Sequence, residues 1–221
     1  MRAAACPLLL LALSACAPWG RIHTPRGSDR LRSAWSLATL WSGVSTRVLF
    51  LSTSTVPCGP PDTQDPDAIT AADMELAQAW TREGSQILVF ALFSDPTSGW
   101  SGSYPVVEVV SPVALDVTEP HAALAAYHAV WEAEVSEEDG LYREYAIVEE
   151  QLRLPVPDPG TLTWEESGDI ASGTFALDSL DISGDFQAEA CPEGEDSLLA
   201  SYLLAALLND WVRPDTDEVY P

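Results

Sequence analysis

The chain has 221 residues, with 34 acidic residues against 10 basic ones and a formal net charge of -24. At 47% hydrophobic residues it can bury a core, which excludes wholesale disorder. Its acidity disfavours nucleic acid or anionic lipid as a partner of the body, and no apolar run reaches the roughly 20 residues of a membrane-spanning helix. The length fits one or two domains, so we expect a folded, strongly acidic body that is not a polytopic membrane protein.

The charge is divided unevenly along the chain. Residues 1–58 contain 6 Arg and 1 acidic residue, whereas residues 59–221 contain 4 Arg and 33 acidic residues. A basic leader therefore precedes an acidic body.

The leader has the pattern of an export signal. Arg2 is followed by an apolar segment over residues 3–13, which is too short for a stable membrane span. The segment ends in Leu13-Ser14-Ala15-Cys16, which resembles the lipobox of bacterial lipoproteins. The resemblance implies diacylglyceryl transfer to the Cys16 thiol, cleavage before Cys16 and acylation of the new amine with a fatty acid such as palmitate. The alternative is an ordinary secretory signal peptide whose cysteine happens to fall at this position.

The lipobox resemblance implies an organisation and a location. Residues 1–15 would be the signal peptide, and residues 16–33, rich in Pro, Gly and Ser, predict a flexible tether. Lipid on Cys16 would hold the protein on a membrane of the bacterial cell envelope. Ala17 in place of Asp favours the outer over the inner membrane, by analogy with lipoprotein sorting in enteric bacteria. Four tether arginines could add attraction to an anionic surface: Arg21, Arg26, Arg30 and Arg32. The alternative is a solvated linker that happens to be basic.

Four cysteines allow one disulfide. Cys6 lies in the leader and Cys16 would carry lipid, which leaves Cys58 and Cys191 as a pair in an oxidising compartment. We predict that these two form a disulfide between an early and a late strand end. Two unpaired buried thiols are the alternative, and a redox site is less favoured because no Cys-x-x-Cys motif is present.

Strand patterns dominate the first half of the body. Residues 44–56 are rich in β-branched residues and run into Pro and Gly at residues 57–61, which predicts a strand with an abrupt end. Residues 71–82 contain helix formers and predict a short helix. Residues 86–93 form a continuous apolar run, typical of a fully buried strand, and residues 104–110 predict a further strand.

The middle of the chain fits both helix and strand. The Ala-rich stretch after Pro120 favours helix, yet apolar and polar residues alternate from Tyr127 to Val135, with Val130 as the one breach. We predict a helical turn near Pro120 followed by a strand. Residues 141–154 are similarly ambiguous, and we favour a strand there.

The last third has clearer signals. Residues 170–179 and 181–190 each contain Ser-Gly-x-Phe followed by alternation, which predicts a β-hairpin. Residues 195–213 predict a helix, with acidic residues at its start and Pro214 after its end. This helix would be apolar on nearly every side, so it must be covered by its own domain or by a partner.

A second resemblance concerns the body. The lipobox, the strand with Leu51-Ser52-Thr53 before Cys58, and the late Ser-Gly-Thr-Phe and Ser-Gly-x-Phe motifs are similar to small uncharacterised lipoproteins of myxobacterial type. The resemblance implies a β-sandwich or calycin-like body and assigns no activity. We therefore expect a mainly β fold over residues 34–213. It would be a single antiparallel β-sandwich or barrel-like domain with a short inserted helix, a packed C-terminal helix and a tail over residues 214–221.

Candidate catalytic and metal sites are weak. Gly99-Trp100-Ser101-Gly102-Ser103 approaches the Gly-x-Ser-x-Gly nucleophile elbow but ends in Ser and lacks the strand-to-helix context. His121, His128 and Glu132 would converge on a metal only if they lay on a helix. Trp100, among Ser and Gly, is a candidate for stacking on a sugar or peptide, unless it folds back on the core.

Two groups of carboxylates could attract calcium, although neither matches the Asp-x-Asp-x-Asp-Gly loop, and a solvated acidic surface is the default. The groups are Asp62, Asp65 and Asp67, and Asp178, Asp181 and Asp185.

Taken together, these patterns predict no catalytic residue, no metal ligand and no cofactor. We expect a membrane-tethered, non-catalytic envelope lipoprotein that acts as a binding or structural module for a protein or glycan partner. An envelope hydrolase or calcium-dependent enzyme is one alternative. A structural subunit of an envelope complex, with the apolar helix as its contact, is another.

Overall fold

The computed structural model describes residues 19–41, 44–56, 58, 78–94, 99–107, 121–138, 142–153, 156–157 and 159–191. Within these residues the fold is mainly β, as the sequence predicts, and 11 strands form one mixed sheet. The strands are β1 (Trp19–Thr24), β2 (Gly27–Arg30), β3 (Ser33–Trp41), β4 (Val44–Ser52), β5 (Gln86–Ser94), β6 (Gly102–Pro105), β7 (His121–Glu138), β8 (Tyr142–Arg153), β9 (Gly160–Ser167), β10 (Ile170–Leu177) and β11 (Ile182–Ala190).

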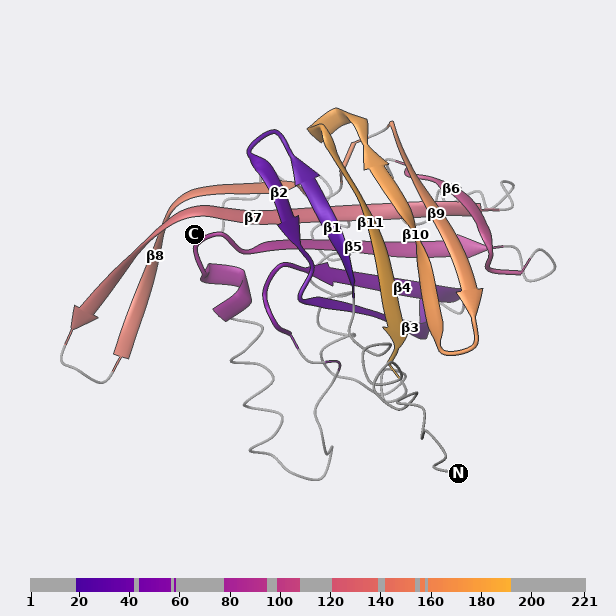
Figure 1. Cartoon of the computed structure of the whole chain (residues 1–221), viewed down its shortest axis with the longest axis horizontal. Helices are drawn as coiled ribbons and strands as arrows, with labels where there is room; N and C mark the ends of the chain where they lie inside the picture. Colours follow the sequence, from indigo (N-terminus) through magenta and orange to yellow (C-terminus); the bar gives the residue numbers. More distant parts are fainter. Residues whose placement is uncertain are drawn as a thin grey trace, which may run out of the picture.

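The sheet folds over on itself. Its strand order is β6-β9-β10-β11-β3-β4-β5-β7-β8, and β1 and β2 branch off beside β11. In Figure 1, β1, β2 and β9 to β11 cross in front of β3, β4, β5 and β7. The two layers are in contact, because Phe90 of β5 and Phe175 of β10 have ring centroids 5.8 Å apart. An isolated parallel bridge between Val106 and Ala123 also brings the end of β6 back to β7.

The expectation of a wholly antiparallel sheet is wrong at one pairing. β11 runs parallel to β3, and their register contains Glu189 opposite Trp35 and Ala190 opposite Ser36. The chain reaches this arrangement because β3 and β11 lie far apart in sequence, so no hairpin turn fixes their relative direction. This short pairing joins the two crossing layers.

The apolar run in β5 reflects coverage of both its faces, and every residue of the strand is buried. Leu88, Phe90 and Leu92 enter the core between the two layers. The alternate residues, among them Ile87 and Val89, enter a second apolar cluster on the other side of the strand. A strand with two buried faces loses the usual alternation of apolar and polar residues.

The predicted hairpin of β10 and β11 is confirmed, and its register explains the repeated Ser-Gly-x-Phe motif. Gly173 lies opposite Phe186, and Phe175 lies opposite Gly184. Each Phe ring therefore covers the glycine of the other strand. A Cβ on Gly173 would collide with the Thr163 carbonyl oxygen of β9, so the close approach of the strands requires glycine.

The prediction of a flexible tether over residues 16–33 is wrong for residues 19–33. Trp19 to His23 pair with β11, and Arg21 to Thr24 pair with β2. Ile22 and Leu31 are buried in the main core, which stabilises this N-terminal hairpin. Pro25 and the arginines that suggested a linker occupy its turn and exposed positions, while β11 supplies the hydrogen-bonding partner.

β7 and β8 form a long hairpin that extends beyond the rest of the sheet (Figure 1). The strands predicted near residues 121–135 and 141–154 are thereby confirmed. The register shifts between Val130 and Ala133, leaving Trp131 and Val148 between the paired residues. Val130 breaks the alternation because both faces of β7 are covered at this point, where His128, Ala129 and Val130 are all buried.

Several predicted elements fall wholly or partly outside the described residues. Of the inserted helix predicted over residues 71–82, only residues 78–82 are described, and residues 78–81 are helical. The helical turn near Pro120, the C-terminal helix over residues 195–213 and the leader lie outside.

Candidate functional site at the N-terminal hairpin

The N-terminal hairpin carries the basic residues that lie nearest in sequence to Cys16, and β1 begins only three residues after it. In β1, Gly20 and Ile22 are buried while Trp19, Arg21 and His23 are exposed. Successive residues of a strand point to opposite faces, so these three exposed residues share the outer face. Cys16, the predicted lipidation site, lies outside the described residues.

Arg30 of β2 extends this outer face, because it lies directly opposite Arg21 in the register. Both arginines are exposed, and no ion pair involves either of them within the described part of the chain. The Trp19 indole donates a hydrogen bond to the Gln187 side chain of β11, which holds the half-exposed ring against the sheet.

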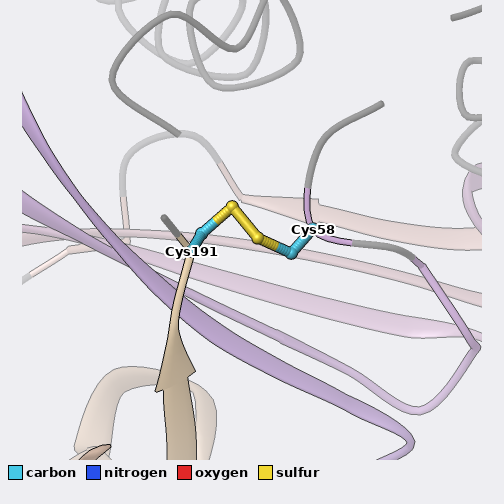
Figure 2. Close-up of a disulfide and its surroundings, with 2 residues drawn as sticks. All are labelled: Cys58 and Cys191. Atoms are coloured by element: carbon cyan, nitrogen blue, oxygen red, sulfur yellow. A yellow bond between two sulfur atoms is a disulfide. The ribbon is translucent and has the colours of Figure 1, made fainter. Parts of the chain in front are cut away.

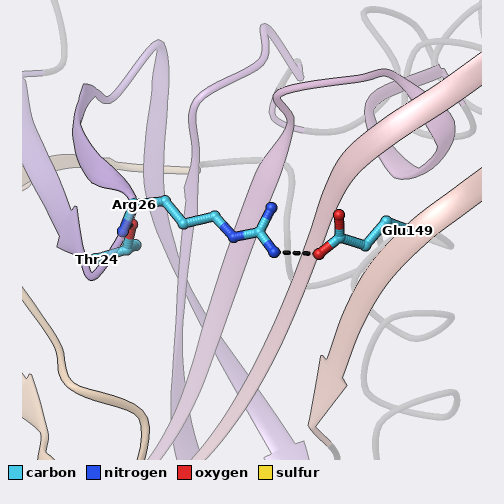
Figure 3. Close-up of polar contacts among 3 residues, drawn as sticks. All are labelled: Thr24, Arg26 and Glu149. Atoms are coloured by element: carbon cyan, nitrogen blue, oxygen red, sulfur yellow. Dashed lines mark hydrogen bonds and ion pairs between the residues drawn. The ribbon is translucent and has the colours of Figure 1, made fainter.

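The turn of the hairpin is fastened to the β7–β8 hairpin. Arg26 pairs with Glu149, as Figure 3 shows, and its guanidinium lies 4.8 Å from the ring centroid of Trp131. The Arg26 backbone N–H also donates to the Thr24 hydroxyl oxygen over 3.2 Å. Both charged side chains are about half exposed, so the ion pair fixes orientation more than it adds stability.

The inner side of β2 has its own polar contact. The Gln86 amide donates to the Asp29 carboxylate over 2.6 Å, and Tyr127 donates to the Gln86 carbonyl oxygen over 3.2 Å. Asp29 is thereby directed away from the outer face that carries Arg21 and Arg30. Burial, followed by the charge of Asp29, raises the pKa of Tyr127 far above its ordinary value, so the phenol stays protonated.

Cys58 and Cys191, which the sequence pairs, are joined in Figure 2, and their Cα atoms lie 5.8 Å apart. Cys191 follows β11 immediately, and its N–H donates to the Ser36 carbonyl oxygen of β3 over 2.6 Å. The bridge therefore lies next to the parallel pairing of β11 with β3.

A cavity of about 340 Å3 adjoins the bridge. Charged residues line it at two points, Arg32 and Glu189, and apolar residues line most of the rest, among them Trp35 and Val56. No nucleophile with an adjacent base lies among its lining residues, so the cavity offers space without an evident reaction.

The described residues do bring one serine close to a histidine. The Ser94 Oγ lies 3.0 Å from His121 Nδ1 and donates to the Gly99 carbonyl oxygen over 2.5 Å. Because the hydroxyl proton is directed to that carbonyl, the imidazole can donate to Ser94 but is not placed to accept its proton. The sequence did not single out Ser94, because these residues are distant in the chain and no motif links them.

Tyr104 completes this cluster and fixes the neighbouring loop. Its ring lies 4.7 Å from that of His121, and its hydroxyl donates to the Trp100 carbonyl oxygen over 2.5 Å. Burial raises the pKa of Tyr104 to about 12, so it remains a hydrogen-bond donor at neutral pH. These contacts link Gly99 and Trp100, which precede β6, to Ser94 at the end of β5 and His121 at the start of β7.

Trp100, the candidate for stacking on a ligand, folds back on the protein. It packs against the main core, and the Arg47 guanidinium covers its ring at 5.2 Å from the centroid. Arg47 also pairs with Glu166 over 3.2 Å. Ser101 accepts a hydrogen bond from the Glu166 N–H instead of standing on a nucleophile elbow.

The histidines considered from the sequence as metal ligands do not converge. His121 and His128 lie seven residues apart on β7, so they point to opposite faces, and the helix that a shared metal would need is absent at these positions. Among the described residues no group of three or more His, Cys, Asp or Glu side chains could hold a metal ion. Asp178, Asp181 and Asp185 belong to this described part, whereas Asp62, Asp65 and Asp67 lie outside it.

His128 is instead a buried structural residue. Its ring stacks on Trp80 with centroids 4.3 Å apart, and Nε2 lies 2.8 Å from the Trp80 carbonyl oxygen. Its Nδ1 is buried and has no hydrogen-bond partner among the residues that the structure describes. Loss of solvation lowers the pKa of His128, although the Trp80 carbonyl and the charge of Glu150 oppose the shift.

This lowered pKa predicts acid destabilisation. Unfolded His128 takes up a proton near its ordinary pKa of about 6.5, whereas the folded protein resists protonation until lower pH. The free energy of unfolding should therefore fall as pH drops below about 6.5. In His128→Phe, which keeps an aromatic ring on Trp80, the part of this decline that comes from His128 should disappear. Urea unfolding of both proteins at several pH values checks this, and parallel pH curves would contradict it.

The N-terminal hairpin is a structured element that was not predicted, although its sequence carries a strand signal. Exposed Trp19, Arg21 and His23 alternate with buried Gly20 and Ile22, a period of two that fits a strand. The run is short and rich in turn residues, and only the distant β11 completes its pairing.

Comparisons with known protein families, curated proteins and solved structures find no match to this chain. In the part of the chain that the structure describes, no helix has the length and apolar character needed to cross a membrane.

Proposed function

We propose that the chain is a lipid-anchored protein of the bacterial cell envelope, held on a membrane through Cys16 after cleavage of residues 1–15. The observation that carries this proposal is the Leu-Ser-Ala-Cys sequence at the end of a short apolar leader. The pairing of Cys58 with Cys191 supports it, because disulfides persist in compartments outside the reducing cytosol.

The position of β1 limits how far the folded body can lie from the lipid on Cys16. Only two residues separate Cys16 from the first residue of β1, and three extended residues span about 10 Å at most. The body would therefore lie against the membrane rather than on a long tether. We propose the outer membrane rather than the inner one, because the residue that follows Cys16 is Ala17 and not Asp.

The role at the membrane is that of a non-catalytic binding or structural module for a protein or glycan. Ser94 and His121 support this over a hydrolase, because the Ser94 hydroxyl proton is bound to the Gly99 carbonyl and Trp100 is held against the core. Crosslinking in native envelopes, followed by identification of the captured molecules, distinguishes a protein partner from a glycan.

We also propose a barrel-like closure of the sheet and a packed C-terminal helix. The Val106–Ala123 bridge supports a barrel-like closure between β6 and β7. We place the apolar C-terminal helix over the second apolar cluster, which includes Trp35, Phe50 and Val89. Cys191 lies in that cluster, so the chain that follows starts beside the face to be covered.

Radiolabelled palmitate tests the anchor in bacteria expressing the full chain. We expect the wild-type protein to incorporate label and Cys16→Ser to incorporate none, because the thiol is the site of lipid transfer. Cys6→Ser is the matched control and should label like the wild type, since residue 6 belongs to the removed leader. Equal labelling of wild type and Cys16→Ser, or no labelling of either, would contradict the proposal.

A further inference from the structure

We propose that the outer face of the N-terminal hairpin, formed by Trp19, Arg21 and Arg30, docks on the headgroups of anionic phospholipids. This inference rests on the proposed lipid anchor and assigns an orientation to the anchored protein. It identifies the one face of an acidic molecule that would meet a negatively charged bilayer.

The side chains suit a membrane interface. Trp19 is 49% exposed, and tryptophan is enriched where protein meets lipid headgroups because its ring is amphipathic. Arg21 and Arg30 are exposed cross-strand neighbours and form no ion pair within the described residues. Two adjacent guanidinium groups can each bind a phosphate through paired hydrogen bonds.

The local charge opposes that of the whole chain. Residues 19–32 contain four arginines and one acidic residue, Asp29, in a chain whose net charge is -24. Asp29 is bound to Gln86 on the inner side of β2, so its carboxylate points away from the outer arginines. On the outer face, the acidic residue Asp185 lies opposite Arg21 on β11.

Ionic screening allows this small basic face to attract the bilayer although the rest of the protein is acidic. The Debye length is about 8 Å at physiological ionic strength, so acidic residues farther from the bilayer contribute little repulsion. The anchor at Cys16 would bring Trp19 within about 10 Å of its lipid. Turning the hairpin toward the bilayer then places positive charge at the surface and keeps the acidic body away from it.

The face is also held in a defined orientation. Trp19 is bonded to Gln187, and Arg26 fastens the turn to Glu149 and Trp131 on the other side of the hairpin. The docking residues are therefore presented by a sheet rather than by a mobile linker, and binding costs less ordering entropy.

An artificial anchor tests the orientation without requiring biological lipidation. The leaderless chain from residue 16 contains every residue that the structure describes. Its Cys16 thiol can be coupled to a maleimide lipid in vesicles while Cys58 and Cys191 remain bonded. Brominated acyl chains quench nearby indoles, and the difference between the wild type and Trp19→Phe isolates the signal of Trp19.

We expect Trp19 quenching on phosphatidylcholine vesicles that contain phosphatidylglycerol, and much less on phosphatidylcholine alone. Arg21→Gln/Arg30→Gln should reduce the ratio of docked to undocked protein about fivefold for each arginine removed. The matched control Arg82→Gln/Arg153→Gln removes the same charge from exposed positions outside the hairpin and should quench like the wild type. Thermal unfolding of each variant verifies the fold.

Equal quenching in the wild type and in the Arg21/Arg30 variant, or an equal loss in the matched control, would overturn the docking face. Quenching of the same extent on neutral vesicles would also overturn it. Because the maleimide lipid supplies the anchor, these outcomes are independent of the palmitate experiment, and failure of one proposal is distinguishable from failure of the other.

Discussion

Replacing Cys58 and Cys191 together with serine should lower the free energy of unfolding by about 2–5 kcal/mol. The bridge closes a loop with a sequence separation of 133, for which the chain-entropy treatment gives an upper figure of about 5 kcal/mol. Urea unfolding of the variant and of the wild type, under non-reducing conditions, measures the difference. Reduction of the wild type should produce the same loss.

The location of the bridge explains why this effect should be large. The crossing layers are joined by the parallel pairing of β11 with β3, whose register contains only two residue pairs. Cys191 directly follows that pairing, and its N–H bonds to Ser36. Hydrogen exchange should therefore show that reduction exposes the amides of β11 and β3 before those of β5. Unchanged stability of the double variant would show that the layers hold together without the bridge.

Gly173→Ala should destabilise the protein by about 3 kcal/mol or more, near or above the upper end of ordinary overpacking. The new Cβ would overlap the Thr163 carbonyl oxygen, which is backbone of β9 and cannot rotate away. It would also approach the Phe186 ring at 3.1 Å. Relief would require β9 to separate from β10, at the expense of the hydrogen bonds between them.

Gly168→Ala is the control for this prediction. Gly168 has φ +62° and nothing within 4 Å of an added Cβ, so alanine there carries only the backbone cost of about 1–2 kcal/mol. Denaturant unfolding should therefore rank Gly173→Ala as the more damaging change. A smaller loss for Gly173→Ala than for Gly168→Ala would contradict the tight packing of β9 on β10.

Sequence reasoning succeeded where the pattern was local. The apolar run of β5 and the paired motifs of β10 and β11 contain most of the information that places them. Strand β1 and the parallel contact of β11 with β3 were not predicted, because each depends on a partner far away in the chain. Strand β2 was missed together with β1, the strand with which it pairs. Propensity alone assigned residues 19–33 to a linker, and tertiary pairing overrides it.

The features of the candidate site also differ in whether the sequence alone predicts them. The lipobox and the pairing of Cys58 with Cys191 follow from motif and arithmetic. The outer face formed by Trp19, Arg21 and Arg30 required the register between β1 and β2, because cross-strand neighbours cannot be identified without it. The environment of His128 likewise depends on Trp80, which approaches from another part of the fold.

Mass analysis of the N-terminal peptide, taken from protein purified out of bacterial membranes, measures the anchor at its proposed atom. The expected peptide begins at Cys16 and carries a diacylglyceryl group on sulfur together with an acyl chain on the amine. A peptide that begins at Met1, or a Cys16 whose thiol and amine are unmodified, would contradict the lipid anchor.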